Sequence, residues 1–96
     1  MKNFFVYILR CSDNSLYTGH TDDLEKRLSE HQSSHNPCYT SSRLPVDLVF
    51  HTAFGSREEA ITAERQIKGW SRAKKQALIE NDFIRIQLLG RRTKIK

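Results

Sequence analysis

A capping box followed by one apolar arc predicts that residues 56–69 form a helix that covers a core. Ser56 is followed three positions later by Glu59, the arrangement in which two side chains satisfy free donors at a helix N-terminus. The apolar residues beyond it recur at helical spacing, and Glu64 falls near the middle of their arc. A carboxylate on a buried face is costly unless it meets a metal, a donor or a cation. Glu64 is therefore a candidate functional residue.

An earlier helix, expected over about residues 22–32, also carries charged or titratable residues where the helical pattern predicts a buried, apolar face. It begins at a Thr-Asp-Asp run that places negative charge at its N-terminus. Leu24 and Leu28 form its apolar stripe, and Arg27 and His31 flank that stripe. Both helices thus point charged or titratable groups toward whatever they pack against. We assign the outward face of this helix to Glu25, Lys26, Ser29 and Glu30.

Three segments indicate β-strands by their aromatic and β-branched content or their alternation: residues 3–10, 16–20 and 46–54. Strict alternation in the third places one set of residues on a common face: Val46, Leu48, Phe50, Thr52 and Phe54. Gly69 is expected to end the 56–69 helix, and Ser71 to cap a basic helix through about residue 80. The order ββαβαα predicts an α/β fold of the α+β kind, a small three-stranded antiparallel sheet flanked by helices.

Length and composition set the scale of the fold. A chain of 96 residues makes one domain with a modest core. We expect this domain over residues 1–82, followed by a basic, partly frayed extension over residues 83–96, where residues 82–89 fit a strand or a short helix. No apolar run approaches the roughly 20 residues of a membrane span. Two cysteines, Cys11 and Cys38, make no disulfide framework, so we expect a cytoplasmic protein.

Positive charge gathers near the C-terminus. Residues 1–65 hold seven Lys/Arg and nine Asp/Glu, whereas residues 66–96 hold nine Lys/Arg and two Asp/Glu. Such asymmetry indicates an end that faces a polyanion, although a solubilising tail would look the same. The best candidates for contacts with a nucleic-acid backbone lie on the third helix: Arg72, Lys74 and Lys75.

Five side chains with useful chemistry occur in a fixed order: Tyr7, Tyr17, Arg27, His31 and Glu64. The two tyrosines belong to the triplets Phe5-Val6-Tyr7 and Tyr17-Thr18-Gly19, and the Arg and His are four residues apart on one helix. This pattern resembles the GIY-YIG nucleases, most closely their small stand-alone bacterial members (UPF0213-like). It is also similar to the catalytic domain of the eukaryotic structure-specific junction endonuclease. Phe5 stands where the family name has Gly.

The resemblance implies hydrolysis of DNA phosphodiester bonds with one divalent metal ion, Mg²⁺ or Mn²⁺. It implies that Tyr7 helps to activate the attacking water and that Tyr17 positions the phosphate or the water. It further implies that Gly19 lets the backbone come close, and that His31 orients a tyrosine or shuttles a proton. A free tyrosine has a pKa near 10, so Tyr7 would need a metal or an arginine nearby to act as a base.

The same resemblance implies that Arg27 binds the scissile phosphate and that Glu64 is the sole protein ligand of the metal. Both residue types suit that chemistry. Arginine offers planar, permanently charged donors to the oxygens on which negative charge develops. One carboxylate with waters and substrate phosphate is a normal Mg²⁺ site.

The tyrosines can share a site only if the hairpin has the right parity. Side chains alternate between the two faces along a strand, and two residues paired across neighbouring strands point to the same face. Tyr7 and Tyr17 therefore share a face only if Tyr7 pairs with an odd-numbered residue, for example Gly19. That pairing requires an odd-length loop or a bulge, since a two-residue turn would separate the tyrosines.

Further candidates come from the polar loop over residues 33–45. Tyr39 and Arg43 could contact nucleic acid there, and Lys68, beside Glu64, is a secondary candidate for a phosphate. The series His31-x-x-x-His35-x-x-Cys38 has some zinc character but lacks a fourth ligand. Each of these residues also fits an ordinary structural role, and Lys68 fits an ion pair with Glu64 one helical turn away.

We expect a DNA endonuclease of DNA repair type that acts on structured or branched DNA, since the chain has no room for a separate sequence-reading module. DNA is the expected partner, together with a protein partner that supplies specificity, and no membrane. Two alternatives stay open. One is a nucleic-acid-binding module without cleavage. The other is a protein-interaction domain that docks a partner through apolar residues in the segment 83–89.

Overall fold

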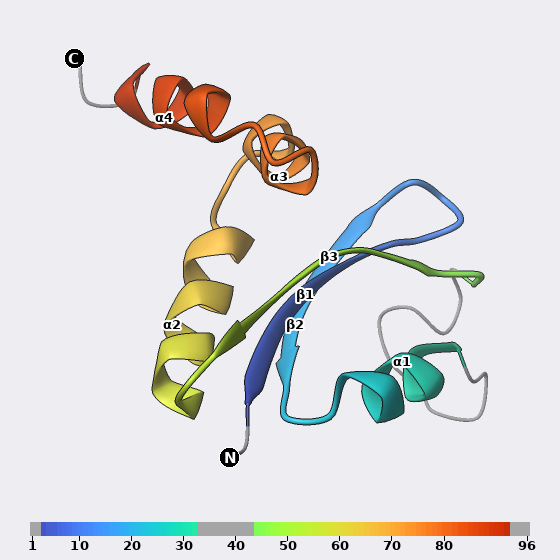
Figure 1. Cartoon of the computed structure of the whole chain (residues 1–96). Coiled ribbons are helices and arrows are strands. Elements are labelled where there is room, and N and C mark those ends of the chain that lie inside the picture. Colours follow the sequence, from blue (N-terminus) through green and yellow to red (C-terminus); the bar gives the residue numbers. More distant parts are fainter. Residues whose placement is uncertain (1–2, 33–43, 93–96) are drawn as a thin grey trace.

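The computed structural model describes residues 3–32 and 44–92. Its elements follow the predicted order ββαβαα, with one further helix at the end (Figure 1). They are β1 (Phe4–Arg10), β2 (Leu16–Thr21), α1 (Leu24–Gln32), β3 (Asp47–Phe54), α2 (Arg57–Lys68), α3 (Arg72–Ile79) and α4 (Phe83–Arg92). The predicted three-stranded antiparallel sheet is confirmed, with β1 at its centre between β2 and β3.

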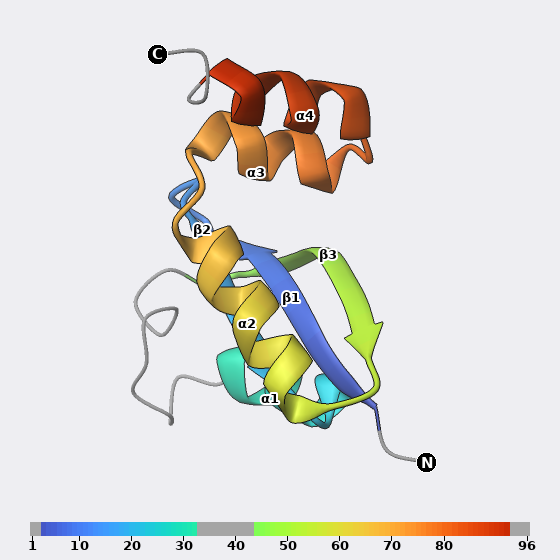
Figure 2. The same cartoon turned by 90° about the vertical axis from the view of Figure 1, so that its left-hand side faces the viewer.

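Helices cover both faces of this sheet. α1 lies against one face and α2 against the other, while α3 and α4 lie side by side beyond the end of the sheet (Figures 1 and 2). On the face that α2 covers, which we call the α2 face, Val6 and Ile8 pack with Ala60 and Ile67. On the opposite, α1 face, a second cluster is formed by Tyr7, Leu9, Cys11 and Val46, with Leu24 and Leu28 packed against it.

A three-residue loop over residues 12–14, closed by hydrogen bonding between Cys11 and Ser15, connects the β1–β2 hairpin and fixes its register. The Cys11 N–H donates to Ser15 O at 2.9 Å, and the Asn14 N–H donates to Cys11 O at 2.9 Å. Asn14 has a φ of 69°, the left-handed conformation that follows a type I turn in hairpins of this length. The loop sets Tyr7 opposite Gly19, so Tyr7 and Tyr17 share the α1 face, as the parity argument requires.

The strict alternation predicted for the third strand is wrong. Ile8 pairs with Phe50, but its neighbour Leu9 pairs with Leu48, so the strand bulges at Val49. A bulge inserts one extra residue, so the side chains beyond it point to the opposite face from the one that strict alternation predicts. The apolar residues of this strand are therefore divided, with Val46 and Leu48 in the α1 face cluster and Phe50 and Phe54 against the α2 face cluster.

The predicted helix caps are confirmed. Ser56 precedes α2 and its hydroxyl accepts from the Glu59 N–H at 3.2 Å, while Ser71 accepts from the Lys74 N–H at 3.2 Å at the start of α3. Gly69 follows α2 with a right-handed φ of −80°, so this cap does not depend on the conformational freedom of glycine.

The segment after α3 is a helix, which settles the choice between strand and helix. Asp82 caps α4 by accepting from the Arg85 N–H at 3.1 Å, and the helix continues through Arg92. Phe83 and Ile84 are 59% and 73% exposed. Within residues 3–32 and 44–92, no helix combines the length and the apolar character that crossing a membrane requires.

Candidate active site

A buried hydrogen-bonded chain occupies the α1 face. The Tyr7 hydroxyl lies 2.9 Å from His31 Nε2, and Arg27 Nε donates to the Tyr7 oxygen at 3.4 Å. Both Tyr7 and His31 are 1% exposed, and the Tyr17 ring lies 5.0 Å from the His31 ring between centroids. Four of the five predicted groups are thus brought together where β1, β2 and α1 meet.

The direction of the proton in this chain follows from the charges. Burial, and then the positive charge of Arg27, lower the pKa of His31, so its imidazole is neutral and has a lone pair to offer. Because Arg27 donates to the Tyr7 oxygen, the Tyr7 hydrogen is left to point at His31. Burial raises the pKa of Tyr7 to about 12 in spite of Arg27, so the nearby arginine does not by itself produce a phenolate.

Gly19 makes room for this arrangement. A Cβ atom built on Gly19 would lie 2.6 Å from the Tyr7 hydroxyl oxygen and 2.8 Å from Tyr7 Cζ. No side chain can occupy that space without moving the ring. Gly19 does allow a close approach to the backbone, and in this structure the group that approaches is Tyr7.

Arg27 has a second partner on its own helix. Its Nη1 lies 3.0 Å from Glu30 Oε1, and both side chains are partly exposed. The bonds to Tyr7 and then to Glu30 raise the pKa of Arg27 further above its usual value. The assignment of Glu30 to the outward face of α1 is therefore wrong, because residues three apart on a helix are neighbours and Glu30 turns toward Arg27.

Glu64 is buried on α2, 9% exposed, and both of its oxygens are bonded. Lys68 Nζ lies 2.6 Å from Oε2, and His20 Nδ1 is hydrogen-bonded to Oε1. Burial opposes ionisation, but the bonds from Lys68 and His20 outweigh it and lower the pKa of Glu64. The buried carboxylate thus meets cationic and donor groups, as the helical pattern predicted.

Glu64 does not share a sheet face with the other four groups. His20, its partner, pairs with Val6 and belongs to the α2 face, whereas Tyr17 pairs with Leu9 and belongs to the α1 face. Alternation along β2 separates them. β2 is an edge strand, however, and the charge of Glu64 still contributes, as the weakest of several causes, to the raised pKa of Tyr7.

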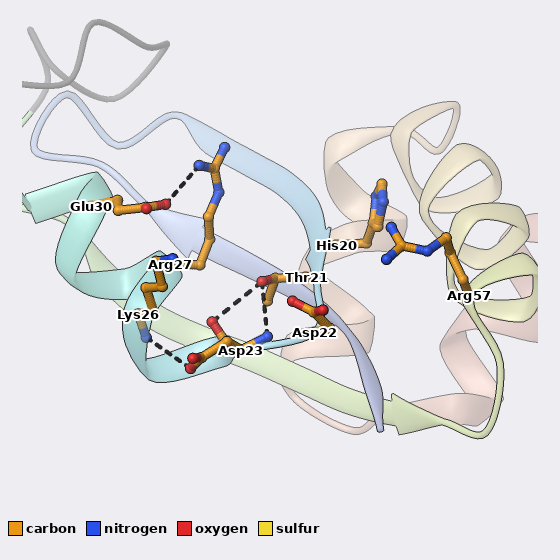
Figure 3. A pocket seen from close by; sticks show the side chains of 8 residues that line it. All are labelled: His20, Thr21, Asp22, Asp23, Lys26, Arg27, Glu30 and Arg57. Carbon is orange, nitrogen blue, oxygen red and sulfur yellow. Dashed lines mark hydrogen bonds and ion pairs between the residues drawn. The ribbon is translucent and has the colours of Figure 1, made fainter. Parts of the chain in front are cut away.

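A polar pocket of about 310 Å³ lies at this edge and connects the two faces (Figure 3). Arg27 reaches it from α1, His20 from β2 and Arg57 from the start of α2. Figure 3 shows the Arg57 guanidinium directed toward His20. Three acidic residues, Asp22, Asp23 and Glu30, also line the pocket and balance its positive charge. The pocket thus brings Arg27, from the α1 side, together with His20 and Arg57, from the α2 side.

Comparison with known proteins assigns the chain to a protein family. Residues 3–77 match the model of a family described as the GIY-YIG catalytic domain. The chain belongs to this GIY-YIG family. The matched span takes in every residue of the buried chain, the pocket and Glu64.

Several relatives share this GIY-YIG domain over most of their length. The UPF0213 protein of Bacillus pumilus is 41% identical over 92 residues, which cover 96% of this chain and 94% of that protein. A UPF0213 protein of Haloquadratum walsbyi is 47% identical over 76 residues, or 79% and 85% of the two chains.

Two solved structures show the same fold. The NMR structure of the UPF0213 protein BH0048 from Bacillus halodurans has a TM-score of 0.55 at 45% identity and covers 81% and 83% of the two chains. The NMR structure of the protein EF2693 from E. faecalis has a TM-score of 0.61 at 32% identity and covers 88% and 90%. The GIY-YIG fold of this chain is therefore shared over most of its length.

The donor set of this GIY-YIG domain fits a metal ion held by one carboxylate. The residues that the structure describes contain no group of three or more His, Cys, Asp or Glu side chains able to hold a metal. A Mg²⁺ ion that keeps its waters needs only Glu64, which has about four lone-pair sites and uses two of them on Lys68 and His20. The zinc hypothesis rests on His35 and Cys38, which lie outside the described residues.

The remaining predicted residues are not gathered at the pocket. α3 lies beyond the other end of the sheet, where the Arg10 guanidinium donates to Gln76 at 3.1 Å. Lys74 Nζ sits 4.4 Å from the centroid of the Trp70 ring. Arg72 is exposed and Lys75 is partly buried, while Tyr39 and Arg43 lie outside the described residues.

The sequence analysis did not select His20 or Arg57, which the structure places at the pocket. Alternation along β2 places His20 on the opposite face from Tyr17, but only the structure shows that the helix carrying Glu64 covers that face. Arg57 gave no comparable signal, since it reads as an exposed residue in the first turn of α2.

Proposed function

We propose that this GIY-YIG domain is a divalent-metal-dependent endonuclease that hydrolyses DNA phosphodiester bonds, with structured or branched DNA as its substrate. One observation carries the proposal. The Arg27 side chain donates to the buried Tyr7–His31 chain and also lines the pocket that His20 and Arg57 share. A phosphate in this pocket would therefore meet a permanent cation that is already coupled to a proton acceptor.

The buried chain suits activation of a water without a free phenolate. Because the pKa of Tyr7 is about 12, complete ionisation near neutral pH is costly. The Tyr7 oxygen can instead accept a proton from the attacking water while its own hydrogen passes to the neutral imidazole of His31, 2.9 Å away. Tyr17 packs against His31 and restricts its ring. Arg27 turns from Glu30 to the phosphate and stabilises the charge that develops there.

Glu64 is the residue that would hold Mg²⁺ or Mn²⁺. When bound, the ion supplies positive charge for the phosphate oxygens or lowers the pKa of a coordinated water. The carboxylate is already ionised at neutral pH, because Lys68 and His20 lower its pKa. It therefore needs no proton loss to accept a metal, and Lys68, 51% exposed on its long stem, is free to swing away.

The basic surface of α3 suits contacts with the DNA backbone away from the pocket. If Arg72, Lys74 and Lys75 each neutralise one phosphate, log K for DNA falls with log salt by about 0.9 for each contact. Replacing all three by Ala should flatten the salt dependence by roughly 2 to 3 units of slope. Fluorescence anisotropy with labelled duplex at several salt concentrations measures it, and an unchanged slope would remove α3 from the interface. Tyr39, Arg43, Lys68 and Gly19 remain predictions for DNA contact.

A cleavage assay tests the function. The chain is incubated with labelled duplex, flap and four-way-junction DNA, with Mg²⁺, Mn²⁺ or EDTA. We expect metal-dependent cuts, fastest on the branched substrates. Binding without any cut on all three substrates would favour the alternative of a nucleic-acid-binding module, and equal rates on duplex and branched DNA would contradict the substrate class.

A protein-interaction function has one specific observation in its favour. Phe83 and Ile84 on α4 are large apolar residues that are mostly exposed. They would suit a protein partner that supplies specificity. Double substitution to Ser should leave cleavage by the isolated chain unchanged under this hypothesis, whereas a loss of cleavage would place α4 in the DNA interface.

A further inference from the structure

His20 connects the two halves of the site. Its Nδ1 bonds the Glu64 carboxylate, while the same ring lines the pocket that Arg27 enters from the opposite face (Figure 3). The side chain is 31% exposed, and no other described residue bonds its second nitrogen, Nε2. Among the described residues, His20 alone both bonds Glu64 and lines this pocket.

The two partners of Glu64 are held very differently. Lys68 is one turn along the same helix, and its side chain is 51% exposed on a long, flexible stem. His20 stands on β2, where backbone pairing with Val6 fixes its position. A short, planar ring on a paired strand has few ways to move, so it can set where the carboxylate points. The lysine only supplies a charge.

We propose that His20 is the positioning residue of the metal-binding carboxylate. It holds Glu64 from the strand side and keeps it at the edge of the sheet, within reach of the phosphate that Arg27 binds. This inference rests on the proposed function and goes beyond it, because His20 is not one of the five site residues predicted from the sequence. Lys68 has the opposite role, since it competes with the metal for the same carboxylate.

The experiment measures Mn²⁺ affinity directly by calorimetry on the whole chain. His20→Ala should weaken Mn²⁺ binding about 10-fold, the lower end of the effect of losing a group that orients a metal ligand. His20→Asn should restore most of the affinity, because its amide nitrogen takes the place of Nδ1. His20→Gln, whose amide reaches the place of Nε2, should not. Lys68→Met should tighten Mn²⁺ binding.

His51→Ala is the matched control. His51 is an exposed histidine on β3 that contacts Phe5 by its ring edge, and its removal should not change Mn²⁺ affinity. In the cleavage assay, His20→Ala should raise the Mn²⁺ concentration for half-maximal rate by the same factor as the affinity loss. A purely structural role would instead lower thermal stability in all three His20 variants without the difference between Asn and Gln.

The outcomes separate this inference from the proposed function. Wild-type affinity in His20→Ala, or no recovery in His20→Asn, overturns the positioning role even if the wild type cuts DNA. No measurable Mn²⁺ binding by the wild type overturns it as well. If the wild type cuts no DNA but the Ala, Asn and Gln series follows the expected order, the positioning role stands and the proposed function fails. If His20→Ala does not fold, the comparison of Mn²⁺ affinity between His20→Asn and His20→Gln tests the positioning role.

Discussion

The two faces of the sheet carry two different kinds of chemistry. On the α1 face, Tyr7 and His31 form a neutral, buried hydrogen-bonded pair with almost no exposure, and Arg27 touches it from the rim. On the α2 face, Glu64 is a buried anion held by Lys68 and His20. Under the proposed function, the first half holds and moves a proton, and the second holds a metal ion.

The difference shows how burial can be used in two ways. Burial on the α1 face keeps both partners uncharged, because it raises the pKa of Tyr7 and lowers that of His31. On the α2 face the same penalty is outweighed by paired charges, so the pKa of Glu64 is lowered. The sheet keeps Tyr7 and His31 apart from Glu64. At the edge strand β2, Arg27, which bonds Tyr7, and His20, which bonds Glu64, line one pocket.

The largest effect is expected from removing the negative charge of Glu64 on the α2 face. Glu64→Gln keeps the size of the side chain but removes the charge that we propose to hold the metal, so cleavage should fall by about 10³-fold or more. DNA binding should survive or tighten, because a negative charge near the phosphate is gone. Single-turnover cleavage and anisotropy measure the two effects, with Glu58→Gln, exposed on the same helix, as the control. Wild-type cleavage by Glu64→Gln would end its role as metal ligand.

The next effect tests whether Arg27 serves the transition state. Arg27→Lys keeps the charge but loses the planar group that reaches Tyr7 and Glu30 together. Cleavage should slow by about 10²-fold, and ground-state DNA binding should change much less. The matched control is Arg65→Lys, since Arg65 is exposed on α2. Equal losses in binding and in rate would assign Arg27 to general attraction of DNA.

A smaller effect tests the packing of the neutral half. Gly19→Ala places a methyl group 2.6 Å from the Tyr7 hydroxyl and should cost about 1–3 kcal/mol of unfolding free energy. Gly55→Ala is the control, because its nearest neighbour, Glu59 Oε1, is 3.9 Å away, and it should stay within about 0.5 kcal/mol. Urea denaturation measures both. Equal stability of the two variants would show that the Tyr7 ring yields easily.

The smallest effect is the pH dependence of the neutral half. The pKa of Tyr7 is about 12 in the folded chain against 10.0 for a free tyrosine, so the fold favours the protonated form. The resulting stability is complete below pH 10 and is lost as the pH rises toward 12, by about 1 kcal/mol at pH 11. Unfolding at pH 9 and pH 11, compared with Tyr7→Phe, checks this prediction. A variant with the same pH dependence as the wild type would assign the loss to other groups.

Local interactions explain why so much of this fold could be predicted. The caps at Ser56 and Ser71 act within four residues of chain, and helical periodicity placed Glu64 on the buried face of α2. The parity of the hairpin followed from alternation, and a three-residue loop satisfied it by setting Tyr7 opposite Gly19. Each of these depends on neighbours in sequence or on one strand pair, so the sequence is enough.

Only the tertiary structure decided how the two halves of the site are joined. The bulge at Val49 depends on how β3 packs between two cores, and no local pattern requires it. The bond between His20 and Glu64 links residues 44 positions apart and depends on how α2 packs against the sheet. Alternation can place His20 on a face, but which side chain meets it there is set by helix docking. Caps and turns follow from residues at fixed spacings along the chain. Contacts between distant elements have no such spacing, so they could not be predicted from local sequence patterns.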